Sequence, residues 1–66
     1  MTLTVNGEKT ELQDGATVAQ LLKKVNTGAS RIAVLVNNTV VKAEKWEAFA
    51  LKDGDHVELL TFAGGG

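Results

Sequence analysis

Alternating apolar and polar residues mark a strand near the start of the chain. Residues 2–5, Thr-Leu-Thr-Val, show the two-residue period of a half-buried strand. Asn6-Gly7 follows, a dipeptide that strongly favours a tight hairpin because both residues tolerate positive φ. Residues 8–12 then predict a second strand that returns beside the first.

Three more strands are predicted in the second half of the chain. Residues 32–36 form a continuous apolar run of strand length, which ends at the turn signal Asn37-Asn38. Val40-Val41 predicts a short strand after that turn. Residues 52–55, Lys-Asp-Gly-Asp, predict another turn, and residues 56–62 predict the last strand.

One segment between the strands has the period of a helix. Its apolar residues follow the spacing i, i+3, i+4 and i+7 of a single helix face: Val18, Leu21, Leu22 and Val25. Thr17 and Gln20 have the spacing of a capping box, so we expect the helix to begin there. Asn26 or Gly28 is placed to end it. A domain this small needs the apolar face of the helix for its own core. We therefore expect the helix to pack on the sheet instead of in a groove of a partner protein.

The predicted order is strand, strand, helix, strand, short strand, short helical turn over residues 43–49, and strand. Strands arranged around one helix favour an α+β fold with the helix on one face of a mixed sheet. We therefore predict a β-grasp domain of four to five strands over residues 1–62, followed by a glycine tail over residues 63–66. The first and last strands would be parallel neighbours at the centre of the sheet, and the tail would extend directly from a central strand.

Parity assigns the two faces of the predicted last strand. The face that carries His56 and Glu58 should be open to solvent, so Val57 and Leu59 should be core. The same parity divides the apolar run into core residues and outward residues: Ile32, Val34 and Val36 inward, Ala33 and Leu35 outward.

Leu60 and Phe62 share the open face with Glu58. Together with Leu35 on the neighbouring strand, they would form an exposed apolar patch at the root of the tail. Such patches usually mark interaction sites, so we predict a partner-docking patch of Leu35, Leu60 and Phe62. The alternative is that these are scattered surface residues, which are normal in soluble proteins.

Composition excludes several function classes. The 66 residues suffice for one domain, and a net charge of −1 without a basic stripe argues against nucleic acid as a partner. With no cysteine and one histidine, we expect neither disulfides nor a clustered zinc site. No apolar run has transmembrane length, and the first residues lack the pattern of a signal peptide, so we expect a cytoplasmic protein that does not contact a membrane.

The sequence ends in Ala63-Gly64-Gly65-Gly66. Glycine has no Cβ, so such a tail is slender enough to thread a narrow channel in another protein. Extended, these four residues would carry the Gly66 carboxylate about 13–14 Å beyond Phe62. The alternative is an inert linker remnant or a frayed end.

Several motifs together are typical of one family. They are the Asn6-Gly7 hairpin, the helix start over residues 17–22, Val36-Asn37, Trp46, the run over residues 51–58 and the terminal glycines. In these features the chain resembles the ThiS family of small sulfur carriers from thiamine thiazole biosynthesis, a branch of the ubiquitin-like proteins. One feature departs from the family: Lys42-Ala43 stands where related sequences often carry Pro-Arg.

The resemblance implies a carrier that other enzymes act on, instead of an enzyme. A ThiF-like activating enzyme would use ATP to adenylate the carboxylate of Gly66, with Gly64 and Gly65 as the slender approach. A cysteine desulfurase or another persulfide protein would supply sulfur, and a ThiG-like thiazole synthase would accept it from the resulting thiocarboxylate. The chain itself would bind no cofactor.

Three other functions stay open. A MoaD-like subunit of molybdopterin synthase shares the fold and the tail, although those chains tend to be longer and often have proline before the glycines, and this chain has none. A ubiquitin-like modifier would instead form an amide through Gly66. A binding domain would carry an inert tail.

The remaining polar residues predict no catalysis. His56 beside Asp55 lacks a nucleophile, Trp46 is expected to fill the core or its edge, and the aspartates around Gly54 suit a turn.

Overall fold

The computed structural model describes residues 1–25 and 31–62. These residues form five strands, one α-helix and a short 3-10 helix. In chain order the elements are β1 (Thr2–Val5), β2 (Glu8–Glu11), α1 (Val18–Val25), β3 (Arg31–Val36), β4 (Thr39–Val41), η1 (Ala43–Lys45) and β5 (His56–Phe62).

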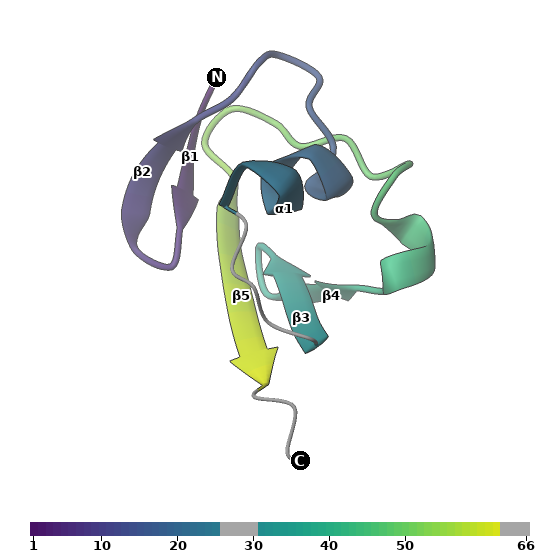
Figure 1. The fold of residues 1–66 in the computed structure, drawn as a ribbon. Helices are drawn as coiled ribbons and strands as arrows, with labels where there is room; N and C mark the ends of the chain where they lie inside the picture. Colours follow the sequence, from purple (N-terminus) through teal and green to yellow (C-terminus); the bar gives the residue numbers. More distant parts are fainter. Residues whose placement is uncertain (26–30, 63–66) are drawn as a thin grey trace.

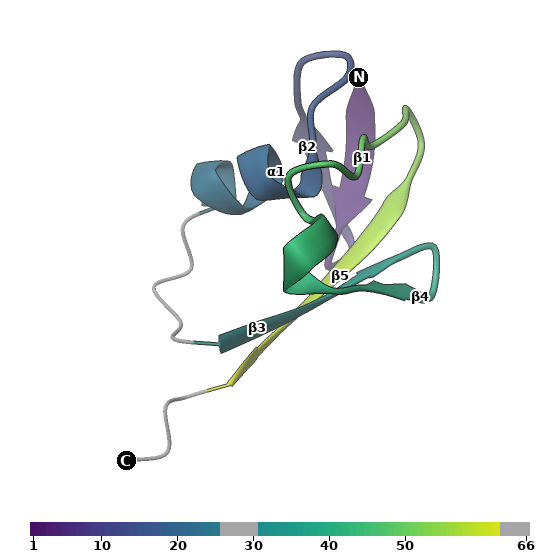
Figure 2. The same ribbon diagram turned by 90° about the vertical axis from the view of Figure 1, so that its right-hand side faces the viewer.

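The five strands make one mixed sheet in the order β2-β1-β5-β3-β4. β1 and β5 run parallel at its centre, with Val5 opposite Val57, whereas the other neighbouring strands are antiparallel. Helix α1 lies across one face of the sheet (Figures 1 and 2). This arrangement confirms the predicted β-grasp fold, including its parallel central pair.

The capping box predicted for the start of α1 is formed. The Thr17 N–H donates to Gln20 Oε1 at 2.8 Å, and the Gln20 N–H donates to Thr17 Oγ1 at 3.3 Å. Each side chain thus satisfies an amide that the first helical turn leaves without a partner. Val18 and Leu21 of the apolar face are fully buried, while Leu22 and Val25 pack at its margin. The two residues predicted to end the helix lie outside the described residues.

The segment around Trp46 anchors the same end of α1. The Val18 and Ala19 N–H groups donate to the carbonyls of Phe49 and Trp46, each at 3.0 Å. The Trp46 indole Nε1–H in turn donates to the carbonyl of Val41 at 2.9 Å. Trp46 is half-buried against the core, which confirms its expected role as a plug at the core's edge. The predicted helical turn over residues 43–49 is shorter than expected, because only residues 43–45 are 3-10 helix and residues 46–48 form a turn.

The core lies between the sheet and α1. Its most deeply buried side chains come from four elements: Leu3, Val18, Leu21, Val34 and Val57.

Two predictions need correction. The second strand ends at Glu11, although the Leu12 N–H still donates to the Met1 carbonyl at 3.0 Å. Ile32 was expected in the core, yet it is only half-buried because it lies near the start of β3, two residues before the fully buried Val34.

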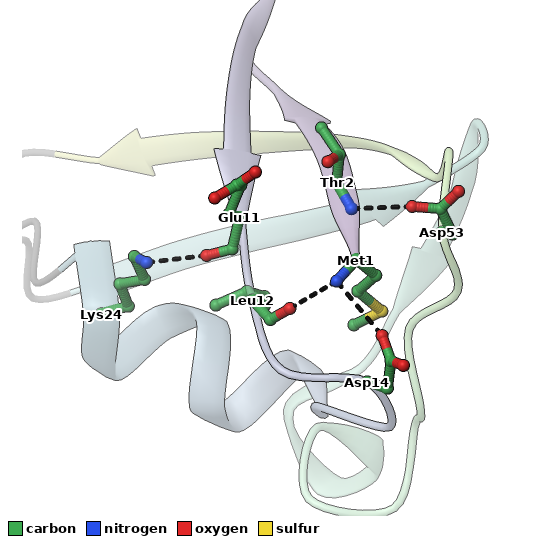
Figure 3. Close-up of polar contacts among 7 residues, drawn as sticks. All are labelled: Met1, Thr2, Glu11, Leu12, Asp14, Lys24 and Asp53. Carbon is green, nitrogen blue, oxygen red and sulfur yellow. Dashed lines mark hydrogen bonds and ion pairs between the residues drawn. The ribbon is translucent and has the colours of Figure 1, made fainter.

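Polar contacts tie the β1–β2 hairpin to its surroundings (Figure 3). The Thr2 N–H donates to Asp53 Oδ1 at 2.7 Å, which joins the first strand to the turn before β5. Lys24 Nζ donates to the Glu11 carbonyl at 2.7 Å, which joins α1 to the end of β2. The Met1 ammonium donates to the Leu12 carbonyl at 2.7 Å and approaches Asp14 Oδ1 at 3.2 Å. Because Asp14 is almost fully exposed, that ion pair adds little stability.

Candidate functional site

The far half of β5 presents apolar side chains to solvent. Val57 and Leu59 are buried, being 1% and 7% exposed, whereas Leu60 and Phe62 are 48% and 52% exposed. The parity predicted from the charged residues of this strand is therefore confirmed. β5 runs away from the N-terminal end of the molecule, so this exposed half lies at the opposite end (Figure 1).

Strand register extends the apolar surface onto β3 and β4. Ala33 lies opposite Leu60, and Leu35 lies opposite both Glu58 on β5 and Val40 on β4. Leu35 shares the open face as predicted, but it is half-buried instead of fully exposed. We call the set Leu35, Val40, Leu60 and Phe62 the open-face patch.

Val40 is the patch residue that the sequence analysis missed. It is 62% exposed, the most open of the large apolar side chains among the described residues. The signal was present in the sequence, because a two-residue turn at Asn37-Asn38 pairs Val36 with Thr39 and hence Leu35 with Val40. An outward Leu35 therefore already implied an outward Val40.

Two charged residues adjoin the open-face patch. Glu58 lies beside Leu35, and Arg31 lies opposite Phe62 at the far end of the β3–β5 pair. Both are exposed. A protein that covers the patch would therefore meet an acidic group within it and a basic group at the end nearest the last residues of the chain.

The polar residues before β5 serve the turn there. Asp55 accepts hydrogen bonds from Asn37 Nδ2 at 3.0 Å and from the Lys52 N–H at 2.8 Å, and Gly54 has a φ of 86°. Asp55 is thus occupied by the turn, and no hydrogen bond joins its carboxylate to the imidazole of His56 within residues 1–25 and 31–62.

The described part of the chain holds no group of three or more His, Cys, Asp or Glu side chains able to bind a metal ion. A surface hollow of about 390 Å³ lies between the β1–β2 turn and β5, lined by Thr4, Asn6, Gly7, His56, Val57 and Glu58.

Within residues 1–25 and 31–62, no helix has the length and apolar character needed to cross a bilayer. The predicted reactive residue Gly66 and its neighbours Gly64 and Gly65 lie outside the described residues.

The strand order, the single helix and the parallel central pair define a ubiquitin-like β-grasp protein. The ThiS family model matches residues 2–66. The chain therefore belongs to the ThiS family.

Similar structures support that membership. The crystal structure of the thiamine biosynthesis protein ThiS from Geobacter metallireducens is 36% identical, covers all of both chains and superposes with a TM-score of 0.84. A solution structure of a thiamine biosynthesis protein from the same organism is 38% identical, with a TM-score of 0.77 over 88% of its chain.

Similar sequences include proteins of two very different lengths. A thiazole synthase of Paramagnetospirillum magneticum is 33% identical over 66 residues, and the chain spans only 20% of its length. The uncharacterized protein ycf40 of Porphyra purpurea is 27% identical, and the chain spans 93% of its length.

Proposed function

We propose that this protein is a sulfur carrier for the synthesis of the thiazole of thiamine, and that the carboxylate of Gly66 carries the sulfur. The observation that carries the proposal is the ThiS family match, which extends over residues 2–66 and so includes the final glycines. The chain would then be a co-substrate of other enzymes and not a catalyst.

The proposed chemistry has two stages. A carboxylate oxygen of Gly66 attacks the α-phosphate of ATP, which forms an acyl-adenylate and releases pyrophosphate. The terminal sulfur of a persulfide then attacks the acyl carbon and displaces AMP, and a thiol cleaves the resulting S–S bond to leave a thiocarboxylate. The first stage needs a ThiF-like activating enzyme and the second a cysteine desulfurase or another persulfide donor. ATP is bound by the activating enzyme.

The structure supports this division of labour. β5 is a central strand that lies between β1 and β3 at its start and pairs with β3 as far as Phe62, so the sheet fixes the point from which the chain continues. The open-face patch includes Leu60 and Phe62 at the end of β5, where a partner that receives the following residues would dock.

A thiazole synthase is the proposed sulfur acceptor. The chain is similar over its full length to a part of the thiazole synthases of Paramagnetospirillum magneticum and Magnetococcus marinus, at 33% and 32% identity. A carrier-like segment within a thiazole synthase supports a functional link between the two. We place the protein in the cytoplasm, where these partners would act.

The departure at Lys42-Ala43 affects a partner contact more than the fold. Both residues are exposed where β4 leads into η1, and the Lys42 carbonyl accepts the Lys45 N–H at 2.8 Å. The backbone there is therefore well formed without the proline that related sequences often carry. A contact that the related arginine makes with a partner would be absent.

Exchange of labelled pyrophosphate into ATP by a ThiF-like enzyme tests the proposal. We expect exchange that depends on this protein and is lost when Gly66 is removed. Absence of exchange would contradict activation by that enzyme. A MoaD-like role predicts instead that sulfur passes to a molybdopterin precursor, and a modifier role predicts an amide with a lysine.

A further inference from the structure

β1 is shorter than its parallel neighbour β5, which continues well beyond the end of β1. Their parallel ladder includes the bonds from the Thr4 N–H to the Asp55 carbonyl and from the Asn6 N–H to the Val57 carbonyl, each at 2.9 Å. β1 ends at Val5, and the chain turns back into β2. β5 continues to Phe62, and among the described residues its last three positions pair only with β3.

The side chain of Asn6 makes the next link of this ladder. Its Oδ1 accepts the Leu59 N–H at 2.8 Å, and its Nδ2 donates to the Leu59 carbonyl at 3.3 Å. In a continuing parallel strand the main chain would make such bonds at this spacing. Here a side-chain amide, which has the same donor and acceptor as a peptide group, takes the place of the main chain that has turned away.

This contact requires asparagine. Asn6 has a φ of 49° at the start of the hairpin turn, a conformation that asparagine and glycine adopt most readily. Glycine would keep the turn but has no amide. Aspartate would keep the acceptor for the Leu59 N–H, yet it would place a carboxylate oxygen against the Leu59 carbonyl.

We propose that Asn6 is a positioning residue for the transfer reaction: it holds β5 at Leu59 and thereby fixes the direction in which the chain leaves the sheet toward Gly66. The inference rests on the proposed function for its catalytic consequence. Leu60 follows Leu59 directly and Phe62 lies two residues further on, so a shift of β5 at Leu59 would move both patch residues of this strand and the point from which the chain continues. Transfer steps are sensitive to such shifts, because the reacting atom must reach a fixed point in the partner.

The first arm of the test is amide hydrogen exchange, which needs no partner. In Asn6→Gly we expect the Leu59 amide to exchange roughly three- to tenfold faster relative to the Val34 amide, the effect of one lost hydrogen bond. In Asn6→Asp the acceptor remains, so the Leu59 amide should stay better protected than in Asn6→Gly. Asn38→Gly is the matched control, because Asn38 also has positive φ, at 70°, but lies in the β3–β4 turn. Unchanged relative protection of Leu59 in Asn6→Gly would overturn the proposal.

The second arm measures adenylation by the activating enzyme well below the melting temperature. We expect Asn6→Gly to lower kcat by at least about tenfold, as ångström-scale misplacement does, with a smaller change in KM. Asn6→Asp, which keeps the acceptor for the Leu59 N–H, should give an intermediate kcat. Asn38→Gly should leave kcat and KM near the wild-type values. If the Leu59 amide exchanges faster in Asn6→Gly but kcat is the same for Asn6→Gly and Asn38→Gly, the positioning role is overturned. If the wild-type chain is not adenylated at all, the sulfur-carrier proposal fails, and the exchange arm still decides whether Asn6 holds β5.

Discussion

Leu59 and Leu60 are chain neighbours in β5, yet the first is 7% exposed in the core and the second 48% exposed on the open face. The same substitution at the two positions should therefore have opposite effects. Leu60→Asp should change the free energy of unfolding by about half a kcal/mol or less, as is usual at an exposed site. Leu59→Asp should unfold the domain, because an unpaired buried carboxylate costs more than the roughly 3–5 kcal/mol that a core of this size supplies.

Circular dichroism melts of the two variants check this prediction, followed by a binding assay on the one that stays folded. Leu60→Asp should weaken binding to the activating enzyme, because it places a charge in the open-face patch. Ala48→Asp is the control, since Ala48 is exposed outside the patch and the change in net charge is the same. A folded Leu59→Asp with an unfolded Leu60→Asp would show that the two faces are reversed.

The capping box predicts a specific coupling between Thr17 and Gln20. Thr17→Ala should cost about 1 kcal/mol, because the Gln20 N–H loses its acceptor at the start of α1. Gln20→Ala should have a smaller effect, and the double variant should cost less than the sum of the two, since the bonds are reciprocal. Urea denaturation of the four proteins measures the coupling. Strictly additive costs would show that the two bonds act independently.

Trp46→Phe isolates one hydrogen bond from the bulk of its side chain. The substitution keeps an aromatic ring against the core but removes the donor to the Val41 carbonyl. We expect a loss of about 1 kcal/mol of stability, the typical net value of such a bond, with adenylation unchanged. Stability equal to that of the wild type in urea denaturation would mean that water replaces the indole at Val41.

The sequence predicted this fold well because its signals are local. Glu58 and His56 mark the open face of the last strand, and that parity correctly placed Val57, Leu59, Leu60 and Phe62. The Thr17–Gln20 spacing likewise predicted a contact that spans three residues.

What the sequence did not predict involves residues far apart in the chain. Asn6 was predicted as a turn residue, but its side-chain bond to Leu59 links positions 53 residues apart. The bonds from the start of α1 to Trp46 and Phe49 depend on tertiary packing in the same way. No local pattern encodes such contacts, because they exist only once the sheet and helix have come together.

Gly65→Val tests the proposed need for a slender tail. A β-branched side chain both widens the tail and restricts its backbone, so we expect much slower activation with little change in melting temperature. Gly65→Ala should give an intermediate rate. The comparison uses adenylation rates at saturating activating enzyme together with thermal melts. Equal rates for the wild type and Gly65→Val would contradict the narrow-channel argument.

The number of residues between the folded domain and the reactive carboxylate should also matter. Removing Gly66, or adding one residue after it, should abolish adenylation while leaving the fold intact, because the carboxylate must sit at a set reach from the docked domain. Both variants should give the wild-type circular dichroism spectrum. Normal ATP-dependent adenylation of the extended chain, with no processing protease present, would rule this out.

The most direct test of the sulfur-carrier function is the intact mass of the protein after incubation with the activating enzyme, ATP, a persulfide donor and a thiol that cleaves the acyl disulfide. The account predicts a mass gain equal to replacement of one oxygen by sulfur, located on the fragment that contains Gly66 and absent from the chain that lacks Gly66. An unchanged mass in the presence of active enzyme and donor, or a much heavier amide conjugate with another protein, would contradict the sulfur-carrier function.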